Sequence, residues 1–345
     1  MLENKNALRD MIFELACADG TPGDEIQAVE KAAEMLEKYM PVRIDILGSV
    51  YGELQGDGPH IMLDAHIDRI GLIVTSVEDS GFIKFAKCGG TDARVLAAAE
   101  VTVWGSEPIY GVITSTPPHL SKGDESKKAK EFADLAIDTG MSGEALKKLV
   151  SPGDRVTVNT KTLELMGDRI SCAALDDRAG VAAVLRCLEM LEGKNHGCKL
   201  SVLFSVQEET GGSGASAGGF SIAPDEAIAV DVSFAMAPGL KPEKCGVLGK
   251  GALIGYSPSL DYKISRDLER IANEKKIDYQ YEVMGGKTGT NADEIQIAGK
   301  GVKMGLLSIP LRNMHTGAEI IDLNDVEAVA ALMAEYVMER GRSDA

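Results

Sequence analysis

Helix and strand patterns alternate at both ends of this chain, and the alternation restricts its fold more than any other feature. Apolar residues have helical spacing over 4–17, 24–39, 175–193, 262–276 and 323–340. Between these segments lie apolar runs as long as buried strands, at 60–67, 199–206, 227–232 and 304–309. Strands interleaved with helices are typical of a mostly parallel sheet covered on both faces. The sequence therefore predicts an α/β domain.

The middle of the chain has a different character. Short β-rich pieces such as GLIVTSV, EVTVWG and YGVITS are separated by Gly, Pro and charged residues over about 70–162. The polar tract 121–132 within it is interpreted as a solvated loop or helix face. We expect a small β-barrel-like domain inserted in a loop, where insertions are best tolerated. The α/β domain would then be discontinuous, with residues 1–69 and 163–345 on either side of the insert 70–162.

Composition and charge exclude several classes of function. With 345 residues, 44% of them hydrophobic and 26% charged, the chain is typical of an ordinary globular protein of about two domains. A net charge of -17 disfavours binding to nucleic acid or to an anionic membrane. No apolar run approaches the roughly 18 residues of a membrane span, and the N-terminus lacks the features of a signal peptide. The six scattered cysteines indicate free thiols, so we expect a cytoplasmic protein with neither nucleic acid nor membrane as partner.

Acidic and histidine side chains collect at strand ends or in the turns that follow them. They are His66, Asp68, Asp176, Asp177, Glu208, Glu209, Asp231 and His315. Because ligands of open α/β sheets bind beyond the carboxyl ends of the strands, these residues are expected to converge on one crevice. Imidazole and carboxylate groups without thiolate suit zinc, cobalt or manganese. The set can also supply what two neighbouring metal ions need, namely a bridging carboxylate, ligands on each side and one free carboxylate.

Five motifs in this order, AHIDRIGL, ALDDRAG, VQEETG, VDV and RNMHT, resemble those of the tetrahedral (TET-type) dinuclear metallo-aminopeptidases. TPPHL (116–120), LGKGALI (248–254) and TGTNADEIQ (288–296) extend the resemblance over nearly the whole chain. That family includes glutamyl and leucyl aminopeptidases and was formerly mislabelled as cellulase M or endoglucanase. The resemblance implies an aminopeptidase that hydrolyses N-terminal residues from short peptides. Two metal ions, a bridging water and a glutamate general base would carry the reaction.

The resemblance also implies which residues hold the two divalent ions, zinc or cobalt. His66 resembles a ligand of one ion, and Asp231 resembles its carboxylate partner. Asp176 resembles the bridging aspartate. Glu209 and His315 resemble the ligands of the other ion.

Two further residues resemble catalytic groups, and two positions depart from the family pattern. Glu208 resembles the general base, and Asp68 resembles the acid that orients His66 through its second ring nitrogen. Asp177 is interpreted as a structural residue of the turn. Arg69 stands where the family usually has an acid, and Asn291 stands where it usually has Asp. Neither change removes a ligand or the base, but both leave the substrate preference open.

The family further implies an assembly. The insert would be a dimerisation or lid domain, and dimers would build a hollow homo-oligomer, a dodecamer whose active sites face inward. Such a chamber would restrict substrates to short, unfolded peptides.

Other functions fit some of the same residues. The site could serve the deacylation of an N-acyl amino acid. Carboxylate pairs also hydrolyse glycosides, but metal-type histidines are unnecessary there and aromatic residues are only 5% of this chain. A non-catalytic scaffold would require the loss of a ligand or of the base, and none is lost. GGSGASAGG (211–219) lacks the context of a nucleotide-binding loop and is interpreted as a flexible turn near the site.

The preferred first residue of the substrate is only weakly indicated. Arg69, Lys287 and Arg312 lie next to motifs that should line the crevice, where a basic group would pair with a carboxylate substrate. Met284 and Leu307 would suit an aliphatic pocket equally well. The sequence therefore disfavours basic first residues by a narrow margin and leaves acidic and aliphatic residues open.

Overall fold

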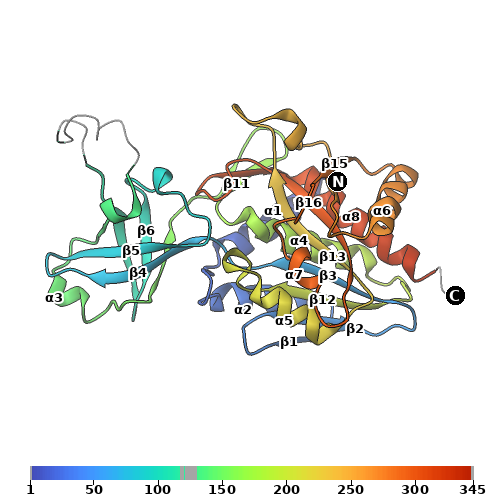
Figure 1. The fold of residues 1–345 in the computed structure, drawn as a ribbon, viewed down its shortest axis with the longest axis horizontal. Helices are drawn as coiled ribbons and strands as arrows, with labels where there is room; N and C mark the ends of the chain where they lie inside the picture. Colours follow the sequence, from blue (N-terminus) through green and yellow to red (C-terminus); the bar gives the residue numbers. More distant parts are fainter. Residues whose placement is uncertain (1, 117–119, 121–129, 343–345) are drawn as a thin grey trace.

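A computed structural model of the chain describes residues 2–116, 120 and 130–342 (Figure 1). Most of the tract that was interpreted as a solvated loop or helix face, 121–129, lies outside the described residues. The chain forms an α/β body and a separate barrel beside it (Figure 1). None of the described helices is long and apolar enough to cross a membrane.

The α/β body is built on one mixed sheet with the strand order β1-β2-β12-β3-β13-β16-β14-β15. Its strands are β1 (Val42–Ile44), β2 (Val50–Leu54), β3 (His60–His66), β12 (Lys199–Ser205), β13 (Glu226–Phe234), β14 (Ala252–Tyr256), β15 (Tyr279–Val283) and β16 (Lys303–Leu311). The central strands β12, β3, β13 and β16 run parallel. The hairpin β1–β2 and strand β14 add antiparallel pairs towards the two edges. The parallel centre brings the carboxyl ends of four strands to one side of the body.

Helices cover both faces of this sheet, as the alternation of patterns predicted. The helices packed in the larger core are α1 (Leu2–Cys17), α2 (Ile26–Leu36), α4 (Leu175–Leu191), α6 (Tyr262–Lys275) and α8 (Leu323–Arg340). The opposite face carries α5 (Ser213–Ile222) and the short α7 (Ala292–Ile295). Successive residues of β3 point to the two faces, since Leu63 packs in the larger core and Met62 in the smaller one. The predicted α/β fold class is confirmed.

The insert is a closed barrel with the strand order β4-β5-β8-β7-β6-β9. Its strands are β4 (Gly71–Val77), β5 (Phe82–Cys88), β6 (Glu100–Trp104), β7 (Pro108–Ile113), β8 (Ile137–Asp138) and β9 (Arg155–Val158), with the short helices η1 (Ala93–Val95), η4 (Phe132–Asp134) and α3 (Gly143–Leu146). Val74, Ile83, Val101 and Val156 belong to a hydrophobic core of its own. A small antiparallel sheet of β10 (Leu163–Glu164), β11 (Arg169–Cys172) and β17 (Glu319–Asp322) follows the barrel. All the barrel strands fall within the predicted insert 70–162.

One local expectation was wrong. The segment 211–219, interpreted as a flexible turn, contributes most of helix α5. Its small residues are needed for packing, because a Cβ on Gly214 would lie 2.5 Å from the backbone oxygen of Val206. A Cβ on Gly218 would lie 2.3 Å from a methyl group of Leu203. The glycines therefore allow the helix to approach β12 closely, and their number is not a sign of flexibility.

Candidate active site

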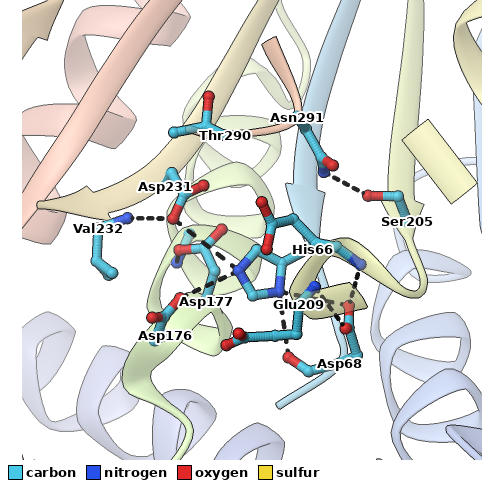
Figure 2. Close-up of polar contacts among 12 residues, drawn as sticks. His66, Asp68, Asp176, Asp177, Ser205, Glu209, Asp231, Val232, Thr290 and Asn291 are labelled. Carbon is cyan, nitrogen blue, oxygen red and sulfur yellow. Dashed lines mark hydrogen bonds and ion pairs between the residues drawn. The ribbon is translucent and has the colours of Figure 1, made fainter. Parts of the chain in front are cut away.

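The acidic and histidine residues singled out in the sequence meet near the carboxyl ends of the parallel strands. Figure 2 labels His66, Asp68, Asp176, Asp177, Glu209 and Asp231 among them. His66 is the last residue of β3, and Asp231 lies inside β13, three residues before its end. Glu208 and Glu209 begin the single turn η5 (Glu208–Thr210), which follows β12. Since β12, β3, β13 and β16 are neighbours, residues from distant parts of the sequence reach one place.

Two groups of three potential ligands share Asp176. One group is His66, Asp176 and Asp231, and the other is Asp176, Glu209 and His315; within each, one donor atom per residue lies within 4.8 Å of the others. Each carboxylate oxygen of Asp176 faces a different histidine. Oδ1 lies 3.0 Å from Nε2 of His66, and Oδ2 lies 3.2 Å from Nε2 of His315. This is the arrangement expected of a carboxylate that bridges two cations.

In each group, the histidine also lies close to a second carboxylate. Nε2 of His66 lies 3.9 Å from Oδ1 of Asp231, and Nε2 of His315 lies 3.3 Å from Oε1 of Glu209. Imidazole and carboxylate donors without a thiolate match the preference of zinc, cobalt and similar ions. The residues present therefore fit a pair of divalent metal ions.

Buried negative charge gives an independent reason to expect cations here. Burial raises the pKa of Asp231 well above its usual value, and neighbouring carboxylates add to the effect although His66 opposes it. Hydrogen bonds that His315 donates to Asp176 and Glu209 raise the pKa of His315 to about 11. Burial would raise the pKa of Asp176, but His315 and His66 outweigh it and lower that pKa. Protons on the histidines thus compensate the carboxylates, and bound metal ions would replace those protons.

Asp176 owes its position to the start of helix α4. Asp176 and Asp177 have non-helical backbone angles, and the peptide bond between them is cis. Oδ1 of Asp177 accepts a hydrogen bond from the backbone N–H of Gly180 at 3.0 Å. A Cβ at Gly180 would lie 2.2 Å from Asp177, so this turn requires glycine there. Asp177 thus supports the turn, and its carboxylate is absent from both ligand groups formed by the described residues.

Glu319 is a site residue that the sequence reasoning missed. Its carboxylate accepts hydrogen bonds from the backbone N–H of His315 at 2.9 Å and of Asp176 at 3.2 Å. One buried side chain therefore ties together the main chains that carry two potential ligands, Asp176 and His315. The only indication in the sequence was an acid four residues after a candidate ligand, too common a pattern to single out.

Glu208 lies beside the ligand groups without belonging to either. Burial raises its pKa to about 7, although the charge of His66 opposes this. A carboxylate with a pKa near neutrality is well suited to general acid–base catalysis. Asp68 holds this residue in place: Oδ1 and Oδ2 accept hydrogen bonds from the backbone N–H groups of Glu208 and Glu209, at 3.0 and 3.1 Å.

Asp68 also lies next to His66, but less directly than the sequence suggested. Nδ1 of His66 lies 3.1 Å from the backbone oxygen of Asp68 and 3.5 Å from its carboxylate. The backbone oxygen therefore makes the shorter contact with the ring (Figure 2). The carboxylate of Asp68 has its stronger hydrogen bonds with the turn that carries Glu208.

Asn291 and Arg69, the two residues that depart from the family pattern, are both buried. Nδ2 of Asn291 donates to Oγ of Ser205 at 2.7 Å (Figure 2). It also donates to Oδ2 of Asp64 at 2.9 Å, so that the three side chains form a buried network. Arg69 is also buried, and its guanidinium lies 4.0 Å from Asp19 and 3.5 Å from the backbone oxygen of Val158. Asn291 therefore acts within the interior, whereas Arg69 also lines a small cavity that Asp176, Glu209 and His315 line as well.

The barrel reaches the metal site through a pair of glycines. A Cβ on Gly90 would lie 2.2 Å from Nδ1 of His315, and a Cβ on Gly89 would lie 3.2 Å from Glu209. The loop after β5 therefore packs against two of the potential ligands, and only glycine allows this approach at position 90.

A cavity of about 860 Å³ opens beside the ligand groups. Asp176, Glu209, Asp231, His315 and Glu208 form one side of it. Strands β13, β14 and β15 and the loops after β15 and β16 provide much of the remainder, including Phe234, Leu253, Glu282, Met284 and Met314. The space is suitable for a peptide whose first residues lie next to the metal site.

Comparisons with known proteins agree with this geometry. The family model of the M42 glutamyl aminopeptidases matches residues 48–332. The chain is 32% identical over 302 residues to a lysyl aminopeptidase of Pyrococcus furiosus, covering 86% of this chain and 87% of the relative. Its fold matches the aminopeptidase APDkam598 of Desulfurococcus kamchatkensis with a TM-score of 0.90, at 32% identity and 98% coverage of both chains.

A third match connects the chain to a known assembly. The TET1 peptidase of Pyrococcus horikoshii, described as able to form a tetrahedron or a large octahedral shell, matches with a TM-score of 0.85 at 31% identity. The match covers 96% of this chain and 99% of that one. The resemblance inferred from the five motifs is thereby confirmed. On these grounds, the chain belongs to the M42 glutamyl aminopeptidase family.

Proposed function

We propose that this protein is a dinuclear metal-dependent aminopeptidase that removes N-terminal residues from short peptides. The observation that carries the proposal is the pair of ligand groups joined by Asp176, with the unligated Glu208 beside them on a peptide-sized cavity. His66 and Asp231 would hold one ion, Glu209 and His315 the other, and Asp176 both. Zinc or cobalt suits these donors.

When bound, a pair of divalent ions polarises the carbonyl to be cleaved and makes water more acidic. The protein's own residues supply the rest of the chemistry. Glu208 accepts the proton of the attacking water and returns it to the leaving amine. Asp68 keeps Glu208 in position through the two backbone hydrogen bonds of the turn. Glu319 fixes the backbone on which Asp176 and His315 are carried.

We also propose an assembly and a location. Residues 70–162 would form the dimerisation or lid domain, with 1–69 and 163–345 as the catalytic domain. The protein would be a homo-oligomer, a dodecamer built from dimers, as the tetrahedral assembly described for the horikoshii relative suggests. All six cysteines are free thiols, which supports a reducing cytoplasm as the location.

Metal analysis combined with a substrate panel tests the function. The purified protein should contain two divalent ions per chain, lose activity on exhaustive chelation, and regain it with zinc or cobalt. It should release amino acids from aminoacyl amides and leave N-acyl amino acids intact. Full activity after complete metal removal, or turnover of N-acyl amino acids alone, would contradict the proposal. Light scattering tests the assembly, which a monomeric mass would refute.

A further inference from the structure

A partly buried carboxylate in the cavity beside the proposed metal site has no use in the proposed reaction. Glu282 lies on the edge strand β15 and lines the cavity together with the ligands. Its two oxygens accept hydrogen bonds from the hydroxyl groups of Ser233 and, at 2.6 Å, Ser308. Among the described residues, no lysine, arginine or histidine pairs with it. The negative charge of Glu282 therefore has no counter-ion in the part of the chain that the structure describes.

The sheet register shows why Glu282 faces the metal site. Ser308 is the Cα partner of the ligand Asp231, and Ser233 follows Asp231 by two residues on the same face of β13. Gly255 of β14 is the Cα partner of Glu282 and has no side chain. The Glu282 side chain can therefore lie across β14 and reach Ser308 on the next strand.

The neighbouring Tyr281 sends its hydroxyl group to the other side of strand β15, although its side chain also borders the cavity. Tyr281 directs its hydroxyl group to Glu269 of α6, at 2.9 Å, on the opposite side of the strand. Successive side chains of a strand alternate, so Glu282 faces away from α6 and towards the cavity. Burial raises the pKa of Glu282, and the hydroxyl groups of Ser233 and Ser308 oppose that rise. A carboxylate in this position is costly unless a cation completes its environment.

We propose that Glu282 binds the side chain of the substrate's first residue and selects a basic one, lysine or arginine. The inference rests on the proposed function, because it places the scissile bond at the shared ligands. Ser233 lies roughly 6.6 Å along the strand from Asp231, at about 3.3 Å per residue. A lysine has a flexible four-carbon stem that can span such a distance, with Leu253, Met284 and Met314 as apolar walls.

The basic residues that favoured the opposite preference do not oppose this pairing. Arg312 donates its Nε–H to the backbone oxygen of Met236 at 2.7 Å, and Arg69 is buried beside a separate, smaller cavity. Neither of them, nor Lys287, lines the cavity formed by the described residues. Lys244 does line it, but it is exposed at the rim. An acidic first residue would meet the charge of Glu282, and an aliphatic one would leave that charge buried without a partner.

Steady-state kinetics on matched aminoacyl amides test the inference. The wild-type metal-loaded protein should hydrolyse Lys- and Arg-amides with a kcat/KM about tenfold or more above that for Leu- and Glu-amides. Glu282→Gln should lower kcat/KM on the Lys-amide by about 10- to 100-fold, the range expected for a lost hydrogen bond to a charged group. The loss should lie mainly in KM, and the Leu-amide should be nearly unchanged. Glu282→Asp, which keeps the charge, should recover part of the preference for lysine.

Controls separate selectivity from structural damage. Glu274→Gln removes the same charge from helix α6, outside the cavity, and should leave the Lys-to-Leu ratio as in the wild type. A wild type that prefers Leu or Glu would overturn the inference. So would a Glu282→Gln variant in which Lys- and Leu-amides decline equally, because a purely structural role predicts that result.

A binding measurement distinguishes this failure from failure of the proposed function. Calorimetry of the metal-loaded protein should show tighter binding of L-lysine than of L-leucine, and Glu282→Gln should abolish the difference. If no amide is hydrolysed, the proposed function fails, and calorimetry alone decides the inference. Equal binding of the two amino acids by the wild type would then refute the role of Glu282.

Discussion

The carboxylate of Asp68 accepts a hydrogen bond from the backbone N–H of Glu208 at 3.0 Å. The second carboxylate oxygen accepts from the next N–H, that of Glu209, at 3.1 Å. Asp68 thus joins the end of β3 to the turn that carries both the proposed base and a proposed ligand. Asp68, two residues after His66, therefore positions this turn at least as much as it orients the ring of His66.

We expect Asp68→Asn to lower kcat more than it lowers metal content. Asparagine has one acceptor oxygen, so one of the two N–H groups would face the amide nitrogen and lose its partner. A lost hydrogen bond to a charged group corresponds to about 1.5–3 kcal/mol. If this loss displaces Glu208, kcat should decline by roughly 10- to 100-fold. Kinetics and metal analysis of the same preparation check this. Equal loss of metal and activity would instead assign Asp68 mainly to the His66 ligand.

Glu208→Gln should keep both ions and lose turnover. The substitution preserves shape and the backbone hydrogen bond to Asp68 while it removes the group that accepts the proton. General-base catalysis typically contributes about 10²–10⁴-fold, so kcat should decline by that factor. A variant with intact metal and activity within a few-fold of wild type would show that another residue is the base.

His315→Ala should retain one ion and lose the other. His315 belongs to the group with Glu209, whereas His66 and Asp231 form the second group around Asp176. Mass spectrometry of the native protein would count the ions per chain. His60→Ala is the matched control, since His60 hydrogen-bonds to Ser201 at 2.8 Å and belongs to neither group. Two ions in His315→Ala would contradict the assignment of this ligand.

The sequence predicted the parts of this molecule that follow from periodicity and strand ends. The helix expected over 175–193 is α4, Leu175–Leu191, and the strand expected over 60–67 is β3, His60–His66. Both have long apolar patterns that tertiary contacts do not override. Convergence of the motif residues also followed from the rule that ligands gather at carboxyl strand ends.

What the sequence did not predict depends on contacts between distant segments. Glu282 sits in the alternating stretch YQYEV, where nothing distinguishes it from a solvated edge residue. Only the register with β14 and β16 shows that it faces the metal site. Glu319 is similar, because its two backbone partners are 143 and 4 residues away. The glycine-rich stretch of α5 was misjudged because composition alone does not show close packing against β12.

Gly90→Ala should lower activity through His315. An added methyl group would lie 2.2 Å from Nδ1 of this ligand, so either the ring or the barrel loop must move. A displacement near 1 Å at reacting groups can cost about 10²-fold in rate. Gly286→Ala is the control, because a Cβ there meets nothing within 4 Å. If Gly90→Ala matches the control in kcat/KM and in metal content, the barrel does not constrain the site.

Asn291→Asp should destabilise the protein, because it places a second carboxylate in a buried network that already contains Asp64. Asn291 now donates its amide N–H to Oδ2 of Asp64 and to Ser205. An aspartate would remove this donor and set two carboxylates against each other without a cation, which costs on the order of 3 kcal/mol when buried. Asn324→Asp is the matched control, since Asn324 also donates to two carboxylates, those of Asp168 and Asp322, but is exposed. Its cost should stay below about 1 kcal/mol because solvent screens the charges. Denaturant unfolding measures the free energy of unfolding of both variants. Equal values would show that burial of the Asp64 network is not the reason why position 291 needs asparagine.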